Sequence, residues 1–216
     1  MDPDTLSKIL NKYLHFETSD SILKLQGLGE PLLAKHFTEL CKIGKEMGFF
    51  VTTTTNGTIY NEEVLQYLDR VIFSIDTLDP IRYRLYRPQA ELNIVIENLY
   101  KTKEHTHVGI NQVLTKYTTK NDVKEIKKFC KIFKLTRSSV SMENWHPSPD
   151  SEVEAARKVW GEVEKRITNC NWCNTQFYYD ASGNLHPCCI RMNDDYIIGD
   201  AESYCRTRHY CGNCPD

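Results

Sequence analysis

The sequence predicts an α/β fold followed by a small cysteine-rich appendix. Apolar strand segments alternate with amphipathic helical segments up to about residue 166, a pattern typical of repeated parallel crossovers. The composition then changes, because seven of the nine cysteines lie in the last 47 residues. We therefore place a domain boundary near residue 168, with an α/β body over residues 1–167 and a metal-binding appendix over residues 168–216.

The expected elements follow in chain order. Asp2 can cap a first helix that begins at Pro3; its apolar face comprises Leu6, Ile9, Leu10, Tyr13 and Leu14. Expected strands span residues 23–26, 49–54, 71–75, 108–114 and 139–142. Expected helices span residues 34–47, 61–68, 79–86, 92–104 and 121–133. Ser151 and Glu154 form a capping box for one more helix; its inner side comprises Val153, Ala156, Val159, Trp160 and Val163. A hairpin is expected from 176–180 and 184–187, turning at Ser182-Gly183.

Composition and charge exclude several classes of protein. A chain of 216 residues can bury a sizeable core, and its net charge is −2 with acidic and basic residues intermixed. This mixture indicates no basic surface that would bind nucleic acid or an anionic membrane. The lysines over 124–134 are expected to be exposed to solvent. No apolar run approaches the ~20 residues of a membrane span, and residues 1–15 lack a signal-peptide pattern. We therefore expect a soluble, cytoplasmic protein with no nucleic-acid or membrane partner.

Polar or glycine-rich residues follow the expected strands. Gly27-Leu28-Gly29-Glu30-Pro31 comes after the first strand and Thr55-Asn56-Gly57 after the second. The third strand ends in Ser74-Ile75-Asp76, the fourth carries Asn111-Gln112, and Glu143 to His146 follow the fifth. Since ligands of parallel α/β folds bind at the carboxyl ends of the strands, we expect a small polar ligand there. The alternative for any single loop is an ordinary turn.

The tail cysteines are spaced as metal ligands. Cys170-Cys173 and Cys211-Cys214 are CxxC pairs, and Cys188 ends the hairpin between them. Thiolates this close along the chain favour a metal or iron-sulfur site in a reducing compartment, with a secreted disulfide-bonded appendix as the alternative. Two histidines of this region, His186 and His209, could be ligands but are interpreted as surface residues. Cys41 and Cys130 share helix faces with apolar residues and are expected to be core thiols.

The order GLGEP, TNG, SID and a terminal CX12GX4C with a returning CxxC resembles the radical S-adenosylmethionine superfamily with a SPASM or shortened Twitch-type C-terminal domain. The resemblance covers about residues 3–216. It implies a partial (β/α)6 TIM-like barrel, here lacking its first strand, and a cofactor-binding set of Gly29, Glu30, Pro31, Asn56, Ser74, Asp76 and Asn111. The first three would lie at the amino group of S-adenosylmethionine, Ser74 and Asp76 near its ribose. Asn111 and residues 142–144 would line the same pocket. Arg87 occupies the place of a family arginine, or is a solvated helix-end residue.

The resemblance also implies the chemistry. A core cluster would cleave S-adenosylmethionine reductively to a 5′-deoxyadenosyl radical that attacks a peptide or small-molecule substrate, with an electron donor such as flavodoxin or ferredoxin. An auxiliary 4Fe-4S cluster in the tail would take Cys188, Cys211 and Cys214, with Cys170 as the leading fourth ligand and Cys173 as its competitor. Cys189 is expected to face away and Cys205 falls outside this set. The same thiolates are equally typical of a structural zinc site.

One departure from the superfamily pattern is clear in the sequence. The chain has no CxxxCxxC run, which holds the core cluster in radical S-adenosylmethionine enzymes. We favour a product shortened before the first strand over loss of radical chemistry, because the substrate-side loops are retained. Two hypotheses follow: a radical enzyme or its shortened body, which could not start the reaction as given, or a non-catalytic barrel remnant whose metal-stabilised tail binds a peptide or partner.

Overall fold

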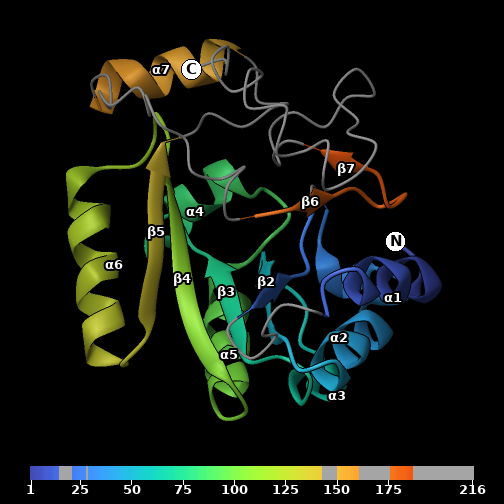
Figure 1. The fold of residues 1–216 in the computed structure, drawn as a ribbon. Coiled ribbons are helices and arrows are strands. Elements are labelled where there is room, and N and C mark those ends of the chain that lie inside the picture. Colours follow the sequence, from blue (N-terminus) through green and yellow to red (C-terminus); the bar gives the residue numbers. More distant parts are fainter. Residues whose placement is uncertain (15–20, 28, 143–149, 161–175, 187–216) are drawn as a thin grey trace.

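The computed structural model describes residues 1–14, 21–27, 29–142, 150–160 and 176–186. Its centre is a five-stranded parallel sheet with the strand order β1-β2-β3-β4-β5 (Figure 1). The strands are β1 (Ile22–Lys24), β2 (Phe50–Thr55), β3 (Arg70–Ser74), β4 (His107–Leu114) and β5 (Thr136–Met142). Each pairs in parallel with its neighbour, so all carboxyl ends lie at one edge. This confirms the predicted α/β class and parallel sheet.

Helices precede, connect and follow the strands of the sheet. They are α1 (Pro3–Asn11), a 3-10 turn η2 (Pro31–Leu33), α2 (Phe37–Glu46), α3 (Glu62–Leu65), α4 (Pro80–Tyr86), α5 (Leu92–Lys103), α6 (Lys120–Ile132) and α7 (Asp150–Trp160). Helices α2, α5 and α6 pack against β2, β4 and β5, respectively. Helix α7 lies beyond the carboxyl ends of β4 and β5 (Figure 1). The sheet edge where ligands are expected is therefore the edge nearest α7.

The N-terminal helix forms as predicted but ends early. The Asp2 carboxylate accepts a hydrogen bond from the Thr5 amide at 2.9 Å, and Pro3 occupies the first helical position. Three of the expected apolar residues, Leu6, Ile9 and Leu10, are buried. Leu14 is 48% exposed, contrary to the prediction, because the helix ends at Asn11 and the apolar period no longer applies beyond it.

Helix α7 buries a narrower face than the sequence predicted. Ala156 is fully buried, and the Trp160 indole N–H donates to the Thr115 carbonyl at 2.9 Å. Val159 is 52% exposed, so its predicted inward position is wrong. Ala156 and Trp160 are four residues apart and share one face, which turns Val159 toward solvent. Val163 lies outside the described residues.

The core fills the space between the sheet and its helices. Val51, Phe73 and Ile110 from the strands meet Val95 and Leu99 of α5, and all are almost fully buried. Both non-tail cysteines, Cys41 and Cys130, are buried in the core, as predicted. Burial raises the pKa of the Cys41 thiol to about 12 and disfavours the thiolate that a metal would need.

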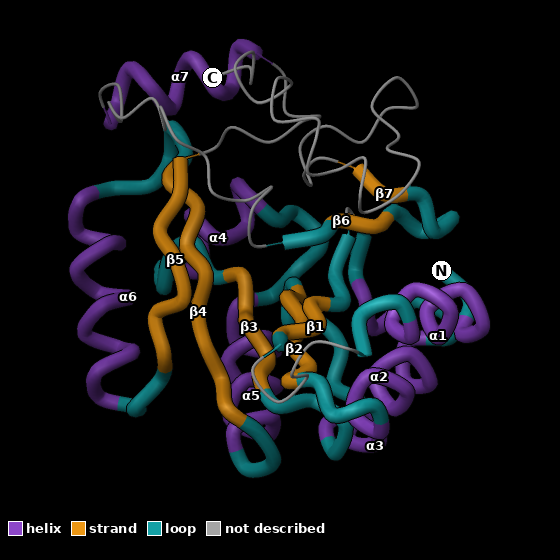
Figure 2. Tube along the Cα trace, viewed as in Figure 1, coloured by secondary structure: helices purple, strands orange, loops and turns teal. Residues whose placement is uncertain are grey.

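The predicted hairpin is present and packs on α1. Its strands, β6 (Tyr178–Tyr179) and β7 (Leu185–His186), are antiparallel and shorter than expected, and the turn contains Gly183 at φ +87°. The hairpin lies next to α1 (Figure 2), where the Tyr13 and Tyr179 hydroxyls are 2.6 Å apart. A Cβ on Gly183 would lie 2.6 Å from a Thr5 methyl carbon. Glycine is therefore required here both by its φ and by the close approach of α1.

Two predictions about the surface have different outcomes. Lysines 124, 127, 128, 131 and 134 are exposed, as expected for a solvated helix face. His186 is 0% exposed, so its interpretation as a surface histidine is wrong. The hairpin turns this side chain inward, which the local sequence pattern alone does not reveal. Within the described residues, no helix is both long enough and apolar enough to cross a bilayer.

Candidate functional site

The carboxyl ends of the central strands bring the predicted polar residues into one row. Ser74 of β3 is in register with Asn111 of β4, and Asn111 is in register with Ser139 of β5. The register between β4 and β5 shifts at Ile110/Asn111. Ser74 and Asn111 are half-buried. Because register partners in a parallel sheet point to the same face, the side chains of Ser74 and Asn111 in this polar row present a hydroxyl and an amide on one face, within reach of one ligand.

The loop after β1 presents open backbone. Gly27 and Gly29 are exposed, and a Cβ built on either one meets no atom of the described residues within 4 Å. Neither takes a φ in the left-handed range. Neither internal packing nor backbone strain therefore demands glycine at these positions. The absence of side chains leaves the amides and carbonyls of this loop accessible to a ligand.

Glu30 joins the first loop to the second. Its Oε1 accepts hydrogen bonds from the Thr55 hydroxyl at 2.7 Å and the Leu32 amide at 3.2 Å, and its Oε2 accepts one from the Asn56 amide at 2.7 Å. Pro31 is buried at the start of η2. The structure thus brings Glu30, Pro31 and Asn56 together, and the Glu30 carboxylate braces the ends of β1 and β2.

The second loop is locked by its own side chains and by the core. Asn56 Oδ1 accepts hydrogen bonds from the Thr58 amide at 2.9 Å and the Thr58 hydroxyl at 2.7 Å. Gly57 has φ +78°, and a Cβ there would lie 2.7 Å from Phe73 and 2.8 Å from Val95. This glycine is required by conformation and by packing, in contrast to Gly27 and Gly29.

Asp76 is a buried carboxylate held by partners from two elements. Its Oδ1 accepts a hydrogen bond from the Val113 amide at 2.9 Å, and its Oδ2 accepts from Arg87 Nη2 at 3.1 Å. Gln112 Nε2 also donates to the Asp76 carbonyl at 3.0 Å. Arg87 is therefore paired and only 26% exposed in its side chain, not a solvated helix-end residue. The pair ties the end of α4 to the ends of β3 and β4.

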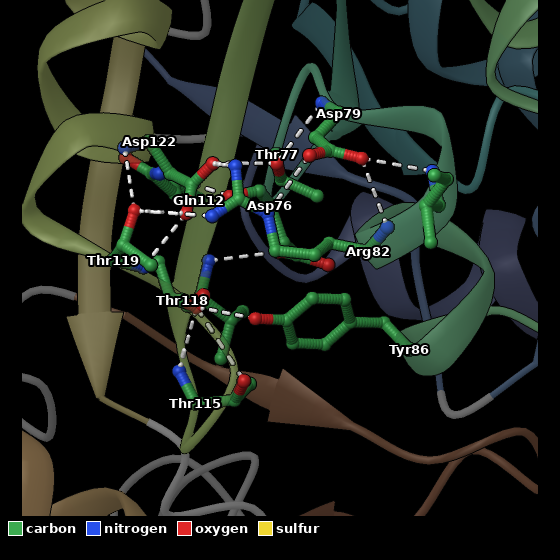
Figure 3. A network of polar contacts seen from close by, with 12 residues as sticks. Asp76, Thr77, Asp79, Arg82, Tyr86, Gln112, Thr115, Thr118, Thr119 and Asp122 are labelled. Atoms are coloured by element: carbon green, nitrogen blue, oxygen red, sulfur yellow. Dashed lines mark hydrogen bonds and ion pairs between the residues drawn. The ribbon is translucent and has the colours of Figure 1, made fainter.

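A second buried carboxylate, Asp122, organises the neighbouring loops (Figure 3). Its Oδ1 accepts hydrogen bonds from the Thr77 hydroxyl at 2.6 Å and Arg82 Nη2 at 2.8 Å. Its Oδ2 accepts from the Thr119 amide and hydroxyl, both at 2.7 Å. Burial favours the neutral acid, but the bonds from Thr119 and Thr77 and the charge of Arg82 outweigh it, so the pKa of Asp122 is lowered.

The loop between β4 and α6 is held from both sides. The Tyr86 hydroxyl of α4 lies 2.9 Å from Thr118 Oγ1, which also accepts a bond from the Thr115 amide at 3.0 Å. Trp160 of α7 bonds the Thr115 carbonyl. Figure 3 shows these threonines beside Tyr86 and Gln112, next to Asp76. The sequence patterns did not indicate Thr77, Arg82 or Asp122. The Thr119-x-x-Asp122 spacing of a capping box was the available signal.

The predicted metal ligands lie outside the described residues. They are Cys170, Cys173, Cys188, Cys211 and Cys214, and the strand-end residues 143–144 are also outside. In the part of the chain that the structure describes, no group of three or more His, Cys, Asp and Glu residues could hold a metal ion. The described site consists of the exposed glycine loop after β1 next to the polar row, braced by three carboxylates whose oxygens accept hydrogen bonds from the protein.

Known proteins that resemble this chain belong to one superfamily. Residues 4–130 match the Radical SAM superfamily. A probable GTP 3′,8-cyclase of Methanosarcina mazei is 30% identical over 94% of this chain and 71% of its own length. A protein of the same name from Methanococcus maripaludis is 29% identical over 92% of this chain and 77% of its own.

Solved structures show the same fold at low identity. Streptococcus suis SuiB bound to its precursor peptide SuiA superposes with a TM-score of 0.66 at 15% identity, over 93% of this chain and 56% of SuiB. The enzyme anSMEcpe, with bound AdoMet and a peptide, superposes with a TM-score of 0.61 at 16% identity, over 94% of this chain and 70% of its own. This chain thus spans little more than half of SuiB. The superfamily match includes β1 to β4 and the loops that carry the polar row, and the chain belongs to the radical SAM superfamily.

Proposed function

We propose that this chain binds S-adenosylmethionine across the carboxyl ends of β1 to β4 and forms the body of a radical S-adenosylmethionine enzyme. One observation carries the proposal. The superfamily match covers residues 4–130, and this range includes both the exposed loop with Gly27 and Gly29 and the paired Ser74 and Asn111 at the strand ends. The five described parallel strands would be part of a partial (β/α)6 barrel over residues 1–167, with a SPASM or Twitch-like appendix over residues 168–216.

The residues present fit the chemistry of S-adenosylmethionine. The exposed backbone at Gly27 and Gly29 suits the amino-acid end of the cofactor, which needs both donors and acceptors at close approach. The half-buried Ser74 and Asn111 offer a hydroxyl and an amide of the kind that hydrogen-bond ribose hydroxyls. When bound at a reduced core cluster, the cofactor supplies a 5′-deoxyadenosyl radical.

The three carboxylates have a different role in this proposal. Glu30, Asp76 and Asp122 use their oxygens to hold loops together, so they position the backbone that meets the cofactor. In this proposal Asp76 does not contact the ligand but anchors the segment that does. The buried negative charge of Asp76 is balanced by Arg87. A rigid set of loops keeps the cofactor in one geometry, which favours a single reaction over side reactions.

Cofactor binding can be tested directly on the 216-residue chain by isothermal titration with S-adenosylmethionine. We expect saturable binding, and Asn111→Ala should weaken it about tenfold, about 1.4 kcal/mol. Asn121→Ala, at an exposed position of α6, is the matched control and should bind as the wild type does. No binding by the wild-type chain, or equal binding by Asn111→Ala, would contradict this placement of the cofactor.

The tail is proposed to hold an auxiliary 4Fe-4S cluster, with Cys188, Cys211 and Cys214 and either Cys170 or Cys173 as ligands. The support is ligand spacing in a chain that belongs to an iron-sulfur superfamily. Anaerobic purification should give a brown protein with iron and acid-labile sulfide in equal amounts. A colourless protein that contains zinc would contradict the iron-sulfur cluster and support a structural zinc site.

A second candidate function comes from the curated relatives. Two probable GTP 3′,8-cyclases align with more than nine tenths of this chain, which favours a purine nucleotide as the substrate over a peptide. Titration of the metal-loaded chain should then show binding of GTP and at least tenfold weaker binding of ATP. Binding of neither nucleotide would leave a peptide or another small molecule as substrate. A flavodoxin or ferredoxin is the proposed reductant.

A further inference from the structure

A second row of polar side chains crosses the sheet at the amino-terminal end of β3 and β4. Cross-strand register pairs Lys24 with Thr52, Thr52 with Arg70, and Arg70 with His107. Because register partners in a parallel sheet point to the same face, these four residues form one row, which we call the basic row. Arg70 precedes Ser74 by four residues on β3, which separates the basic row from the polar row by ~13 Å. The basic row is therefore distinct from the proposed cofactor site.

The basic row lies on the face of the sheet that points away from α2 and α5. Successive side chains on a strand point to opposite faces. Val51 of β2 faces α2, since a Cβ on Gly44 would lie 3.1 Å from a Val51 methyl carbon. Phe73 of β3 belongs to the core that α5 completes. Thr52 is one residue from Val51 and Arg70 is three from Phe73, so both point to the other face.

Two adjacent members of the basic row have buried polar atoms that no described residue satisfies. Thr52 is 1% exposed, and its hydroxyl has no hydrogen-bond partner. The Nε of Arg70 is also buried and without a partner. The Arg70 guanidinium carbon lies 5.6 Å from the centre of the Phe50 ring, a contact that orients the side chain. Buried polar groups are rarely left unpaired, and an arginine Nε can only donate, so the missing partner must be an acceptor.

The charges around Arg70 favour an anion as that acceptor. On the face that carries the basic row, β1 to β4 present no acidic residue from the amino-terminal end up to the polar row. The neighbouring carboxylate, Asp69, pairs with Lys45 of α2 and accepts a hydrogen bond from the β2 backbone at 2.8 Å. Arg70 itself forms no ion pair within the described part of the chain. A partly buried cation is normally paired, so this one indicates an anionic ligand.

We propose that Thr52 and Arg70 bind a phosphate group, with Lys24 adding positive charge at the exposed end of the basic row. The guanidinium presents Nε–H and one Nη–H in parallel, which matches two oxygens of a phosphate, and the Thr52 hydroxyl donates to a third. A phosphate dianion also matches the two positive charges of Arg70 and Lys24. The ligand is either free inorganic phosphate or the phosphate group of a larger metabolite. This site goes beyond the proposed function and does not depend on it.

Isothermal titration of the full 216-residue chain with inorganic phosphate, in a buffer free of phosphate and sulfate, tests the site directly. We expect saturable binding with a Kd of about 1 mM or lower. Because phosphate would bind only the folded chain, it should also raise the midpoint of thermal unfolding as its concentration increases. Neither measurement requires a variant to fold.

Thr52→Val separates ligand binding from a structural role. Valine keeps the size of the side chain and removes the hydroxyl, so phosphate should bind about tenfold more weakly. Since the hydroxyl has no protein partner, the unfolding midpoint measured without phosphate should equal that of the wild type or exceed it. A hydroxyl that served only the fold would give the opposite result, a lower midpoint.

Arg70→Gln removes the proposed anion-binding charge and should lose at least tenfold in phosphate affinity. Arg84→Gln is the matched control, because it makes the same change of charge at an exposed position of α4, where Arg84 pairs with Glu91. This control should bind phosphate as the wild type does. A comparable loss in both variants would show that phosphate responds to net charge and would contradict the site.

Titration with glycerol 3-phosphate distinguishes the two sources of the phosphate group. Binding at least as tight as that of inorganic phosphate assigns the site to a phosphorylated metabolite, and weaker binding assigns it to free phosphate; both results support the site. The proposal is overturned if the wild-type chain binds neither compound at about 20 mM, well above the expected Kd. Unchanged phosphate affinity in Thr52→Val or in Arg70→Gln, or a lowered unfolding midpoint in Thr52→Val, overturns it as well.

Discussion

The loop after β1 and the loops after β2 to β4 occupy the same sheet edge but are built differently. Gly27 and Gly29 of the first loop are exposed, with open space where a side chain would be. The later loops are locked: Gly57 packs against Phe73 and Val95, and Asp76 and Asp122 bind several partners each. The difference indicates a division of roles, in which the first loop offers backbone to a ligand and the later loops provide a rigid frame.

This division changes how the superfamily motifs should be interpreted. Glycine in GLGEP and glycine in TNG look equivalent in the sequence, yet only Gly57 has a conformational need for glycine. Glu30 and Asp76 look like ligand-binding carboxylates, yet their oxygens accept hydrogen bonds from the protein. Substitutions in the two regions should therefore separate loss of stability from loss of cofactor binding.

The largest effect is expected from Gly57→Ala. Alanine at φ +78° is strained, and its Cβ would approach Phe73 to 2.7 Å, so the free energy of unfolding should fall by about 3 kcal/mol. Urea denaturation followed by circular dichroism measures the change. An unfolding midpoint equal to that of the wild type would show that the second loop can rearrange and that the two regions are not built differently.

Asp122→Asn should destabilise the frame by about 2 kcal/mol at neutral pH, because Arg82 and Thr77 lose their charged acceptor while Arg82 can still rehydrate. The folded-state pKa of Asp122 lies below its ordinary value, so its contribution is complete well above pH 4 and is lost as the pH falls through the folded pKa. The difference in unfolding free energy between wild type and variant should thus start to narrow as the pH falls below about 4, and it should keep narrowing until the pH has passed the folded-state pKa.

Glu125→Gln, an exposed change three residues further along α6, is the matched control for Asp122→Asn. It should leave the free energy of unfolding within about 0.5 kcal/mol of the wild type at every pH. If the difference in unfolding free energy between the wild type and Asp122→Asn stayed constant with pH, the charge of the carboxylate would not be what holds the loops together.

The outline of the fold could be predicted from the sequence because it depends on local patterns. Alternating apolar strands and amphipathic helices placed all five strands, and the Asp2-Pro3 cap placed α1. Two residues predicted to be buried are exposed. Leu14 lies beyond the end of α1, where the helical period no longer applies, and Val159 faces solvent because Ala156 and Trp160 determine which side of α7 packs on the protein. The burial of His186 was missed because two strands of two residues each are too short for their alternation to show which face of the hairpin is covered.

The candidate site was predictable only in its position. The order of polar residues after the strands located the sheet edge, and the structure places Ser74 in register with Asn111 as that order requires. The bracing roles of Glu30 and Asp76 could not be predicted, because their partners Thr55 and Val113 come from other strands. Asp122 was missed for the same reason, since Thr77 and Arg82 precede it by 45 and 40 residues.

A smaller effect is expected from Asn56→Ala, which opens the turn of the second loop. The variant loses the acceptor of two hydrogen bonds from Thr58, and the free energy of unfolding should fall by about 1 kcal/mol. A double-mutant cycle with Thr58→Val should show a coupling of about 0.5–1 kcal/mol, because the two side chains share a bond. Additive effects would mean that Asn56 does not act through Thr58.

The smallest effect on stability, and the most informative one about function, is expected from Gly27→Ala. Among the residues that the structure describes, no atom lies within 4 Å of a Cβ at this position, and the backbone is not in the left-handed range, so the free energy of unfolding should stay within about 0.5 kcal/mol of the wild type. The methyl group would nevertheless occupy the space through which a ligand reaches the backbone. Calorimetric titration should therefore show S-adenosylmethionine binding about tenfold more weakly, with the unfolding curve unchanged. Unchanged affinity would show that the open loop after β1 does not face the cofactor, and the contrast between the two regions would then be one of packing alone.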